Sequence, residues 1–254
     1  MIFTILGSGT SQGVPVIGCR CEVCLSKDKK DKRLRTAALV SKEGVNIAID
    51  CGPDFREQML RAKVSHLNAV LLTHEHSDHI AGIEDLRPFQ FRQNQPMPVY
   101  ATHAVQASLK QRYHYAFFET LYPGAVQMDL KTISKDQAFQ IENIDIIPIE
   151  LNHGEIKVLG FRFNDLSYLT DCKSISSVEF KKIKGTRVLI LDALHHTEHH
   201  SHLSVKDALE IVAEVKPEQA YFVHASHNMG KTRDVNKTFP KEVKLAWDGL
   251  KIEI

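Results

Sequence analysis

The histidines of this chain are distributed in a way that constrains the fold it can adopt. Histidine occupies 14 of the 254 positions, and ten of these fall within residues 74–79, 195–202 and 224–227. The strongest pattern is H-x-H-x-D-H at residues 74–79, which directly follows the apolar run 69–72. Four potential metal ligands that follow a buried strand so closely predict a rigid scaffold whose strand ends open into a metal site.

Short β-rich runs recur along the chain and predict about a dozen strands. They cover residues 2–6, 37–41, 45–49, 69–73, 99–101, 144–151, 158–163, 168–170, 187–191, 220–223, 243–246 and 250–254. Helical patterns predict helices over 54–62, 80–89, 104–113 and 204–215, the last with Ser204 as N-cap and Asp207 in a near capping-box position. Strands in mixed order with few helices fit two mixed β-sheets with helices packed outside. No linker divides the chain, so we expect one domain over residues 1–254.

Other apolar runs also end in potential metal ligands, namely His153, Asp171 and His224. In an extended segment His74 and His76 can point to one side and share a metal, whereas Asp78 and His79 need a turn to face a neighbouring point. The pattern therefore predicts two metals. Asp165 is a rival to Asp171, which we prefer because the strand at 168–170 leads directly into it.

A second site is indicated by the cysteines, three of which (Cys19, Cys21 and Cys24) lie within six positions. A closed tetrahedral zinc site needs a fourth ligand, and His227 is the preferred candidate because it follows His224 by one short turn. Cys51 and Cys172 lie in or beside apolar runs, where small buried cysteines are common. An odd total of five cysteines, three of them tightly spaced, argues against a disulfide framework and for a reducing, cytoplasmic compartment.

With its H-x-H-x-D-H motif the chain resembles the metallo-β-lactamase fold superfamily over nearly its whole length. The resemblance implies an αββα sandwich and a binuclear centre. Carried onto this sequence, it implies that His74, His76 and His153 hold one metal, that Asp78, His79 and His224 hold the other, and that Asp171 bridges them. Nitrogen and oxygen ligands suit Zn²⁺ or Mn²⁺. A hydroxide shared by two such ions, about 3.5–4 Å apart, would be a nucleophile at neutral pH.

Further motifs resemble the PhnP-type phosphodiesterases, a branch that acts on cyclic ribose phosphates in phosphonate breakdown. They are the glycine-rich segment 7–15, the cysteine cluster, the segment 50–56 and the late His227. The resemblance implies a structural zinc on Cys19, Cys21, Cys24 and His227 beside the binuclear centre. It also implies that His202 is the general acid, with His200 as the alternative.

The remaining histidines carry no motif of their own. We expect loop or supporting roles for His195, His196 and His199, and structural or surface roles for His66, His103 and His114. The charged run at residues 27–35 predicts a solvated loop or helix face, with phosphate binding as the alternative.

Charge and hydropathy limit the classes of molecule that the chain is expected to bind. With 32 basic and 31 acidic residues the net charge is +1, which argues against general electrostatic attraction to nucleic acid. No apolar run approaches the roughly 18 residues of a membrane helix, and the first residues lack the pattern of a signal peptide. Together with the resemblance to PhnP-type phosphodiesterases, these features predict a cytoplasmic hydrolase of a small or cyclic phosphodiester that does not bind membranes, with a homodimer as one option.

Three other functions are consistent with parts of the pattern. A tRNA 3′-end endonuclease would be expected to carry a long basic arm rich in Gly and Pro, which the sequence lacks. A non-phosphoester metallo-hydrolase, such as a β-lactamase or thioester hydrolase, would use the same core. A non-catalytic metal-binding protein would not need the complete ligand set.

Overall fold

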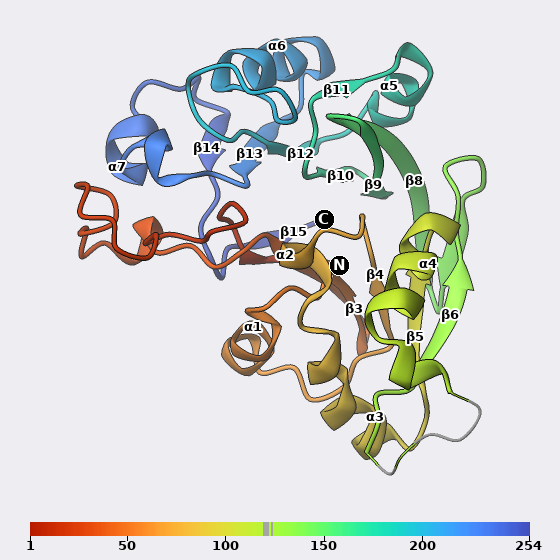
Figure 1. Ribbon diagram of the computed structural model, residues 1–254. Coiled ribbons are helices and arrows are strands. Elements are labelled where there is room, and N and C mark those ends of the chain that lie inside the picture. Colours follow the sequence, from red (N-terminus) through yellow and green to blue (C-terminus); the bar gives the residue numbers. More distant parts are fainter. Residues whose placement is uncertain (119–121, 123) are drawn as a thin grey trace.

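The strands form two sheets that pack face to face. In the computed structural model, which describes residues 1–118, 122 and 124–254 (Figure 1), the first sheet has seven strands. In order across the sheet these are β15 (Lys251–Glu253), β1 (Ile2–Gly7), β2 (Ala37–Lys42), β3 (Val45–Ile49), β4 (Ala69–Leu71), β5 (Met97–Ala101) and β6 (Met128–Thr132). The second sheet contains β11 (Ser174–Ile175), β8 (Ile144–His153), β9 (Ile156–Phe163), β10 (Leu166–Leu169), β12 (Val188–Asp192), β13 (Gln219–Val223) and β14 (Val243–Leu245), with β7 (Phe139–Ile141) paired to β8.

Both sheets are mixed. In the first, β15, β1, β2 and β3 run antiparallel to their neighbours, whereas β3, β4, β5 and β6 are parallel. In the second, β8, β9 and β10 are antiparallel, whereas β10, β12, β13 and β14 are parallel. The carboxyl ends of the parallel strands therefore meet at one edge of each sheet, which is where open α/β sheets place their ligands.

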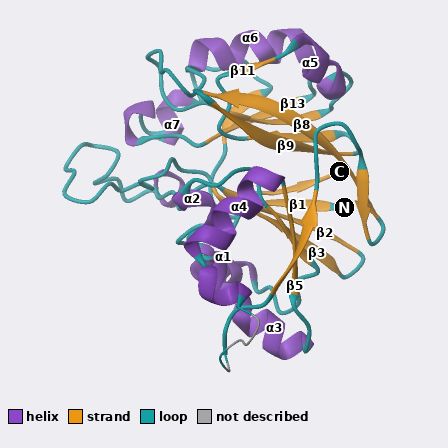
Figure 2. Cartoon of the chain, turned by 45° about the vertical axis from the view of Figure 1, so that its right-hand side comes forward, coloured by secondary structure: helices purple, strands orange, loops and turns teal. Residues whose placement is uncertain are grey.

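Helices cover the outer face of each sheet, so the chain has four layers (Figure 2). α1 (Phe55–Ala62), α3 (Arg87–Gln93) and α4 (His103–Arg112) pack on the first sheet through one apolar cluster. α5 (Ser177–Ile183) and α6 (Val205–Val215) pack on the second sheet through another, and α7 (Thr232–Val235) joins them. Three of the largest fully buried side chains, Phe3, Phe161 and Tyr168, lie between the sheets. The predicted αββα sandwich of two mixed sheets is confirmed.

The segment after the histidine motif differs from its prediction as one helix over 80–89. α2 (Ser77–Ile80) is a single turn, a 3₁₀ turn follows at Ile83–Leu86, and α3 begins at Arg87. Pro88 lacks an N–H to donate, so a helix starts there rather than running through it. Gly82 also packs so tightly that a Cβ on it would lie 2.1 Å from the carbonyl oxygen of Gly52.

The charged run at residues 27–35 was predicted to be a solvated loop or helix face, but it is not wholly solvated. Arg33 is 4% exposed, and its guanidinium donates to Ser8 Oγ at 2.9 Å, to the carbonyl oxygen of Ala246 at 2.6 Å and to Thr232 Oγ1 at 2.8 Å. A buried charge needs such partners because it has left water. The run therefore anchors the N-terminal loop to the C-terminal part of the chain.

Three short strands and two helices escaped prediction: β6, β7, β11, α5 and α7. Of these, β11 has only two residues and β6 is largely exposed, so neither has a clear apolar alternation. No helix in the described part of the chain is long and apolar enough to cross a membrane.

Candidate metal centre

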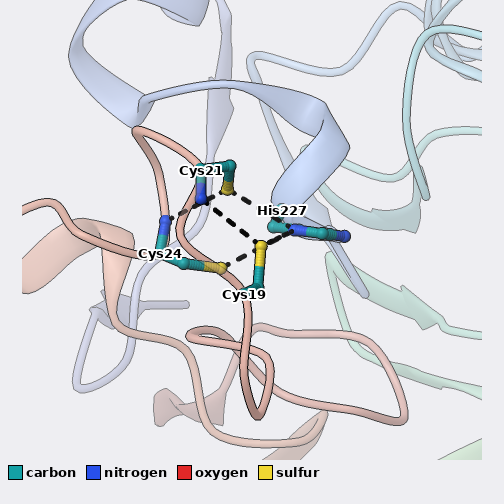
Figure 3. A group of neighbouring side chains, drawn as sticks. All are labelled: Cys19, Cys21, Cys24 and His227. Carbon is teal, nitrogen blue, oxygen red and sulfur yellow. Dashed lines mark hydrogen bonds between the residues drawn. The ribbon is translucent and has the colours of Figure 1, made fainter.

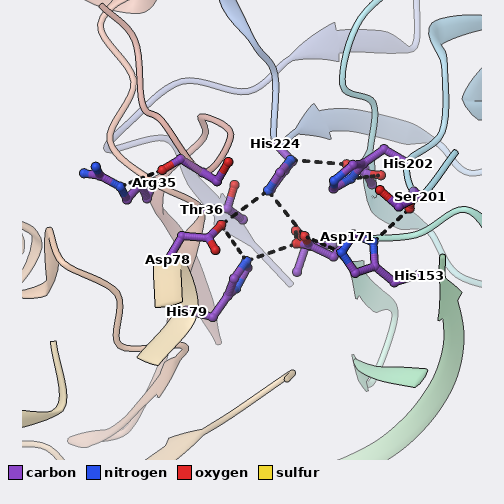
Figure 4. A network of polar contacts seen from close by, with 12 residues as sticks. Arg35, Thr36, Asp78, His79, His153, Asp171, Ser201, His202 and His224 are labelled. Carbon is purple, nitrogen blue, oxygen red and sulfur yellow. Dashed lines mark hydrogen bonds and ion pairs between the residues drawn. The ribbon is translucent and has the colours of Figure 1, made fainter. Parts of the chain in front are cut away.

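The predicted ligands of the H-x-H-x-D-H motif lie where two sheets bring their strand ends together. His74 follows β4, His76 is the N-cap of α2, and Asp78 and His79 lie within α2. From the second sheet, His153 ends β8, Asp171 follows β10 and His224 follows β13. Figure 4 shows five of these side chains, those of Asp78, His79, His153, Asp171 and His224, pointing toward one another.

The first ligand group consists of His74, His76 and His153, each of which offers a nitrogen within 4.8 Å of the others. The His74 ring centroid lies 4.5 Å from that of His76 and 5.5 Å from that of His153, and the His76 and His153 rings are 5.2 Å apart. His74 and His153 are buried, whereas His76 is exposed. The group therefore has one side that is accessible to solvent.

The second group consists of Asp78, His79 and His224, again within 4.8 Å of one another. His79 Nε2 lies 3.2 Å from Asp78 Oδ2, and His224 Nε2 lies 3.8 Å from the same oxygen. All three members are buried or half-buried.

Asp171 stands between the two groups. Its Oδ1 lies 4.0 Å from His74 Nε2, 3.8 Å from His153 Nε2 and 3.4 Å from His224 Nε2. Its Oδ2 lies 3.3 Å from His79 Nε2. One carboxylate thus faces ligands of both groups, as a bridging residue would. Its rival Asp165 is exposed and pairs with Arg187 instead.

The donor atoms fit divalent ions. Nε2 of His74, His79 and His224 is buried and has no hydrogen-bond partner in the described structure. A buried polar atom without a partner is costly, so native proteins seldom leave one unless a ligand or ion uses it. All three atoms point into the same cluster of nitrogen and carboxylate ligands, which is a donor set that suits zinc or manganese.

Hydrogen bonds on the far side of the rings determine which nitrogen faces the centre. His153 Nδ1 donates to the carbonyl oxygen of Ser201 at 2.8 Å, which leaves the Nε2 lone pair for a metal. His79 Nδ1 lies 2.7 Å from Asp50 Oδ2. Such outer partners orient metal-binding histidines and raise their basicity.

Asp50 is a functional residue whose role the sequence reasoning missed. It is fully buried after β3, and it accepts from the backbone N–H and the hydroxyl of Thr73 at 2.9 and 3.0 Å while it holds His79. The available signal was its position directly after the apolar run 45–49.

Asp192, at the end of β12, is the second residue whose role was missed. Its Oδ2 lies 3.1 Å from His202 Nδ1 and accepts from the backbone N–H groups of Cys172 and Leu203, both at 3.2 Å. Its Oδ1 lies 3.8 Å from His224 Nδ1. Asp192 therefore contacts both the expected general acid and an expected ligand.

The structure places His202 against both ligand groups. Its ring lies 4.7 Å from that of His153 and is stacked 4.6 Å from that of His224. It also falls within 4.8 Å of His153 and Asp171 donor atoms. His200, the alternative, is exposed and contacts the His199 ring at 4.3 Å.

Three strand ends at the centre have left-handed backbone. Asp50, Asp171 and His224 have φ of 66°, 52° and 59°. Residues other than glycine seldom adopt this region, and where they do the conformation is often part of a functional site. Here each one turns the chain sharply after a strand.

The electrostatics of the cluster favour positive charge. Burial alone would lower the pKa of His224, but Asp171 and Asp78 raise it to about 9. Burial would likewise lower the pKa of His79, but Asp171 and Asp50 raise it well above its usual value. Burial also opposes ionisation of Asp171, yet His224 and His79 hold its pKa well below the usual range. Carboxylates that stabilise a proton on these rings would also stabilise a cation.

A second cluster contains Cys19, Cys21, Cys24 and His227 (Figure 3). The three sulfur atoms lie 3.3, 3.5 and 3.6 Å from His227 Nδ1. In a tetrahedral zinc site with bonds of about 2.3 Å to sulfur and 2.0 Å to nitrogen, such distances are about 3.5 Å. The four residues therefore fit a closed zinc site.

Backbone amides support the thiolates of this cluster. The N–H groups of Val16, Cys21 and Cys24 lie 3.4–3.5 Å from the sulfur atoms of Cys24, Cys19 and Cys21 respectively. The hydrogen bond from Cys24 lowers the pKa of the Cys21 thiol to about 6, whereas burial raises the pKa of Cys24 to about 11. The alternative ligands Cys51 and Cys172 are fully buried in the two outer apolar clusters.

The other histidines are placed as follows. His66, His103 and His114 are exposed, and His196 donates from Nε2 to the carbonyl oxygen of Met229 at 3.0 Å. His195 and His199 are half-buried in the loop that leads to His202.

The chain is similar to several known proteins. Residues 45–225 match the family model described as "Beta-lactamase superfamily domain". A crystal structure of "a New Diphosphatase from the PhnP Family" is 36% identical, with a TM-score of 0.92, and the match covers 99% of this chain and 96% of that one. Zn(2+)-bound PqqB from Methylobacterium extorquens shares the fold at 20% identity, with a TM-score of 0.83 and full coverage of both chains.

Curated proteins of similar sequence carry names other than diphosphatase. An octanoyltransferase of Porphyromonas gingivalis is 37% identical over 248 residues, which cover 97% of this chain and 50% of the relative. Coenzyme PQQ synthesis protein B of Methylorubrum extorquens strain PA1 is 33% identical over 55% of this chain and 48% of that protein. The chain thus spans about half the length of these curated relatives.

The family model covers more than half of the chain, and its fold and donor set agree with the match. The chain therefore belongs to the beta-lactamase superfamily domain family and has the metallo-β-lactamase fold, with relatives of the PhnP type.

Proposed function

We propose that the chain is a phosphodiesterase that hydrolyses a small or cyclic phosphodiester, such as a cyclic ribose phosphate, at a binuclear metal centre. The observation that carries this proposal is the position of His202, which is held by Asp192 and lies against both ligand groups. A phosphodiester has a poor alkoxide leaving group, so its cleavage benefits from a proton donor beside the metals.

The ligand assignment follows the two groups. His74, His76 and His153 would hold one ion, Asp78, His79 and His224 the other, and Asp171 would contact both. Two divalent ions, Zn²⁺ or Mn²⁺, would supply a nucleophile from water at neutral pH and neutralise charge on the attacked phosphoryl group. A further zinc on Cys19, Cys21, Cys24 and His227 would stabilise the N-terminal loop.

His202 would act through one nitrogen. Because Nδ1 lies 3.1 Å from Asp192 Oδ2, Nε2 is the atom that can carry a proton to the leaving oxygen. The buried carboxylate orients the ring and stabilises the imidazolium before the proton leaves. After transfer the alkoxide departs as an alcohol and His202 is left neutral.

Hydrolysis of a diphosphate is the second candidate, because the 36% identical structure is described as a diphosphatase. A phosphate leaving group needs less help from an acid than an alkoxide does. The two candidates therefore differ in how strongly they depend on His202.

A substrate panel tests the proposal. It contains bis(p-nitrophenyl) phosphate, a 2′,3′-cyclic nucleotide, a nucleoside diphosphate, precursor tRNA, a β-lactam and an octanoyl thioester. We expect turnover of the small phosphodiesters and its loss in a His74→Ala control. Turnover of the lactam or the thioester with none of the phosphate compounds would contradict the proposal.

The leaving group tests the role of His202. His202→Ala should slow a substrate with an alkoxide leaving group by about 10²- to 10⁴-fold, and an activated nitrophenyl ester far less. His66→Ala, a change at an exposed histidine, serves as the control. Equal losses on both substrates would exclude a general acid at this position.

A further inference from the structure

The loop from residue 195 to 202 contains more histidine than the centre uses. We propose that His195, His199 and His200 form a surface site for a divalent metal ion of the zinc type, from which ions exchange into the metal centre. The role as a feeder rests on the ligand assignment proposed above, whereas the surface site itself does not.

The ring of His199 has the other two histidines as neighbours, at one separation shorter and one longer than those of a histidine ligand group in the same molecule. His199 lies 4.3 Å from His200 and 5.9 Å from His195, measured between ring centroids. Ring separations of 4.5–5.5 Å are found within the group of His74, His76 and His153. His195 and His200 therefore both neighbour His199, and rotation of their side chains would bring three imidazoles to one ion beside it.

One of the rings is already oriented by a hydrogen bond, and a second is exposed to solvent. His195 Nδ1 donates to the carbonyl oxygen of Thr197 at 2.9 Å, so its Nε2 lone pair is directed away from the loop. This is the outer hydrogen bond that metal-binding histidines commonly make. His200 is exposed, and its ring is accessible to ions in solution.

His199 needs a small adjustment. Its Nδ1 accepts from the backbone N–H and the hydroxyl of Ser201 at 3.3 and 3.2 Å. These contacts are long, and the hydroxyl can rotate to accept a proton from Nδ1 when Nε2 binds an ion. The rearrangement moves the ring proton from Nε2 to Nδ1, turns the Ser201 hydroxyl, and gives up the 3.3 Å hydrogen bond from the Ser201 backbone N–H.

The site is connected to the centre by a row of rings. His199 lies 5.2 Å from His202, which lies 4.7 Å from His153 and 4.6 Å from His224. The exposed carboxylate of Glu198 adds negative charge beside His199, and it lies 3.9 Å from Lys173 at its nearest approach. A cation captured at the surface would therefore be held at the mouth of the centre, where its local concentration is raised.

The test titrates Ni²⁺ into the zinc-loaded enzyme by calorimetry, without substrate. We expect one ion to bind beyond those already present, and we expect the His195→Ala/His200→Ala double variant to weaken this binding at least about tenfold. His199 is left unchanged because it contacts Ser201 and His202. His196→Ala is the matched control, since its ring is bonded to the Met229 carbonyl and it lies in the same loop.

A second measurement follows exchange of isotopically labelled zinc into the loaded enzyme, which should slow several-fold in the double variant and not in the control. No additional ion, an unchanged affinity in the double variant or an unchanged exchange rate would each overturn the proposal. Neither measurement uses hydrolysis. A failure of the phosphodiesterase proposal would instead appear as normal metal binding with no turnover of the substrate panel.

Discussion

Two buried aspartates show how single residues prepare the centre without belonging to either ligand group. Asp50 holds His79 and Asp192 holds His202, and both are fully buried. A carboxylate behind an imidazole fixes the ring and its tautomer. These residues therefore act as positioning residues, and their effect should be seen in kcat more than in KM.

Asp192→Asn tests this at the residue scale. The amide keeps the shape but loses the charge that stabilises an imidazolium, so kcat should fall by about 10- to 100-fold with little change in KM. The pH profile of kcat should also shift, which a purely structural role would not produce. Asp165→Asn, at an exposed aspartate, is the control. An unchanged kcat and pH profile would exclude the role given to Asp192.

At the scale of elements, the centre depends on how closely the turns after β3 and β4 pack. The backbone N–H of Cys51 donates to the carbonyl oxygen of His79 at 2.7 Å, and the backbone N–H of Gly82 donates to the carbonyl oxygen of Cys51 at 2.8 Å. A Cβ on Gly52 would lie 1.9 Å from the carbonyl oxygen of Asp78. Only glycine therefore allows α2 to sit where its ligands face the centre.

Gly52→Ala should displace α2, because the added methyl group overlaps backbone that is fixed by two hydrogen bonds. We expect the free energy of unfolding to fall by at least about 1–3 kcal/mol. We also expect weaker metal binding at the group of Asp78, His79 and His224. Denaturant unfolding and metal analysis provide the two readouts. Gly44→Ala is the control for a destabilised glycine site away from the centre: it adds backbone strain at φ +86° with no heavy atom within 4 Å, and it should leave the metal content unchanged. Full metal content in Gly52→Ala would contradict this account.

The helix α6 offers a stability test that leaves the metals untouched. Ser204 accepts from the Asp207 N–H at 3.2 Å and the Asp207 carboxylate accepts from the Ser204 N–H at 3.1 Å, which completes the capping box. Ser204→Ala should cost about 1 kcal/mol, which corresponds to roughly 2–4 °C in Tm. A Tm unchanged within error would mean that the cap contributes nothing.

At the scale of the whole molecule, the cysteine cluster joins segments from opposite ends of the chain. His227 lies three residues after His224, and Gly9 pairs with both Arg35 and Ala225. Buried Arg33 adds its hydrogen bonds to Ser8, Thr232 and Ala246. The N-terminal loop is therefore tied beside the segment that supplies His224.

Removal of one thiolate tests this link. Cys24→Ser should leave the chain with one zinc fewer and lower its free energy of unfolding by roughly 2 kcal/mol or more, because a structural metal contributes directly to folding. Leu25→Ser, at the next and exposed position, is the control. Unchanged zinc content in Cys24→Ser would remove this residue from the site.

The sequence by itself indicated the local part of each donor set and most of the strands, because these depend on local spacing. H-x-H-x-D-H after an apolar run, three cysteines within six positions and the Ser204 cap are all readable within a few residues. Only the tertiary structure decided that Asp50 meets His79 across 29 positions and that Arg33 is buried, because such contacts arise when separate strands and loops converge. The break in the helix after α2 belongs with these, since it combines Pro88 with a backbone contact between Gly82 and Gly52 that no local pattern contains.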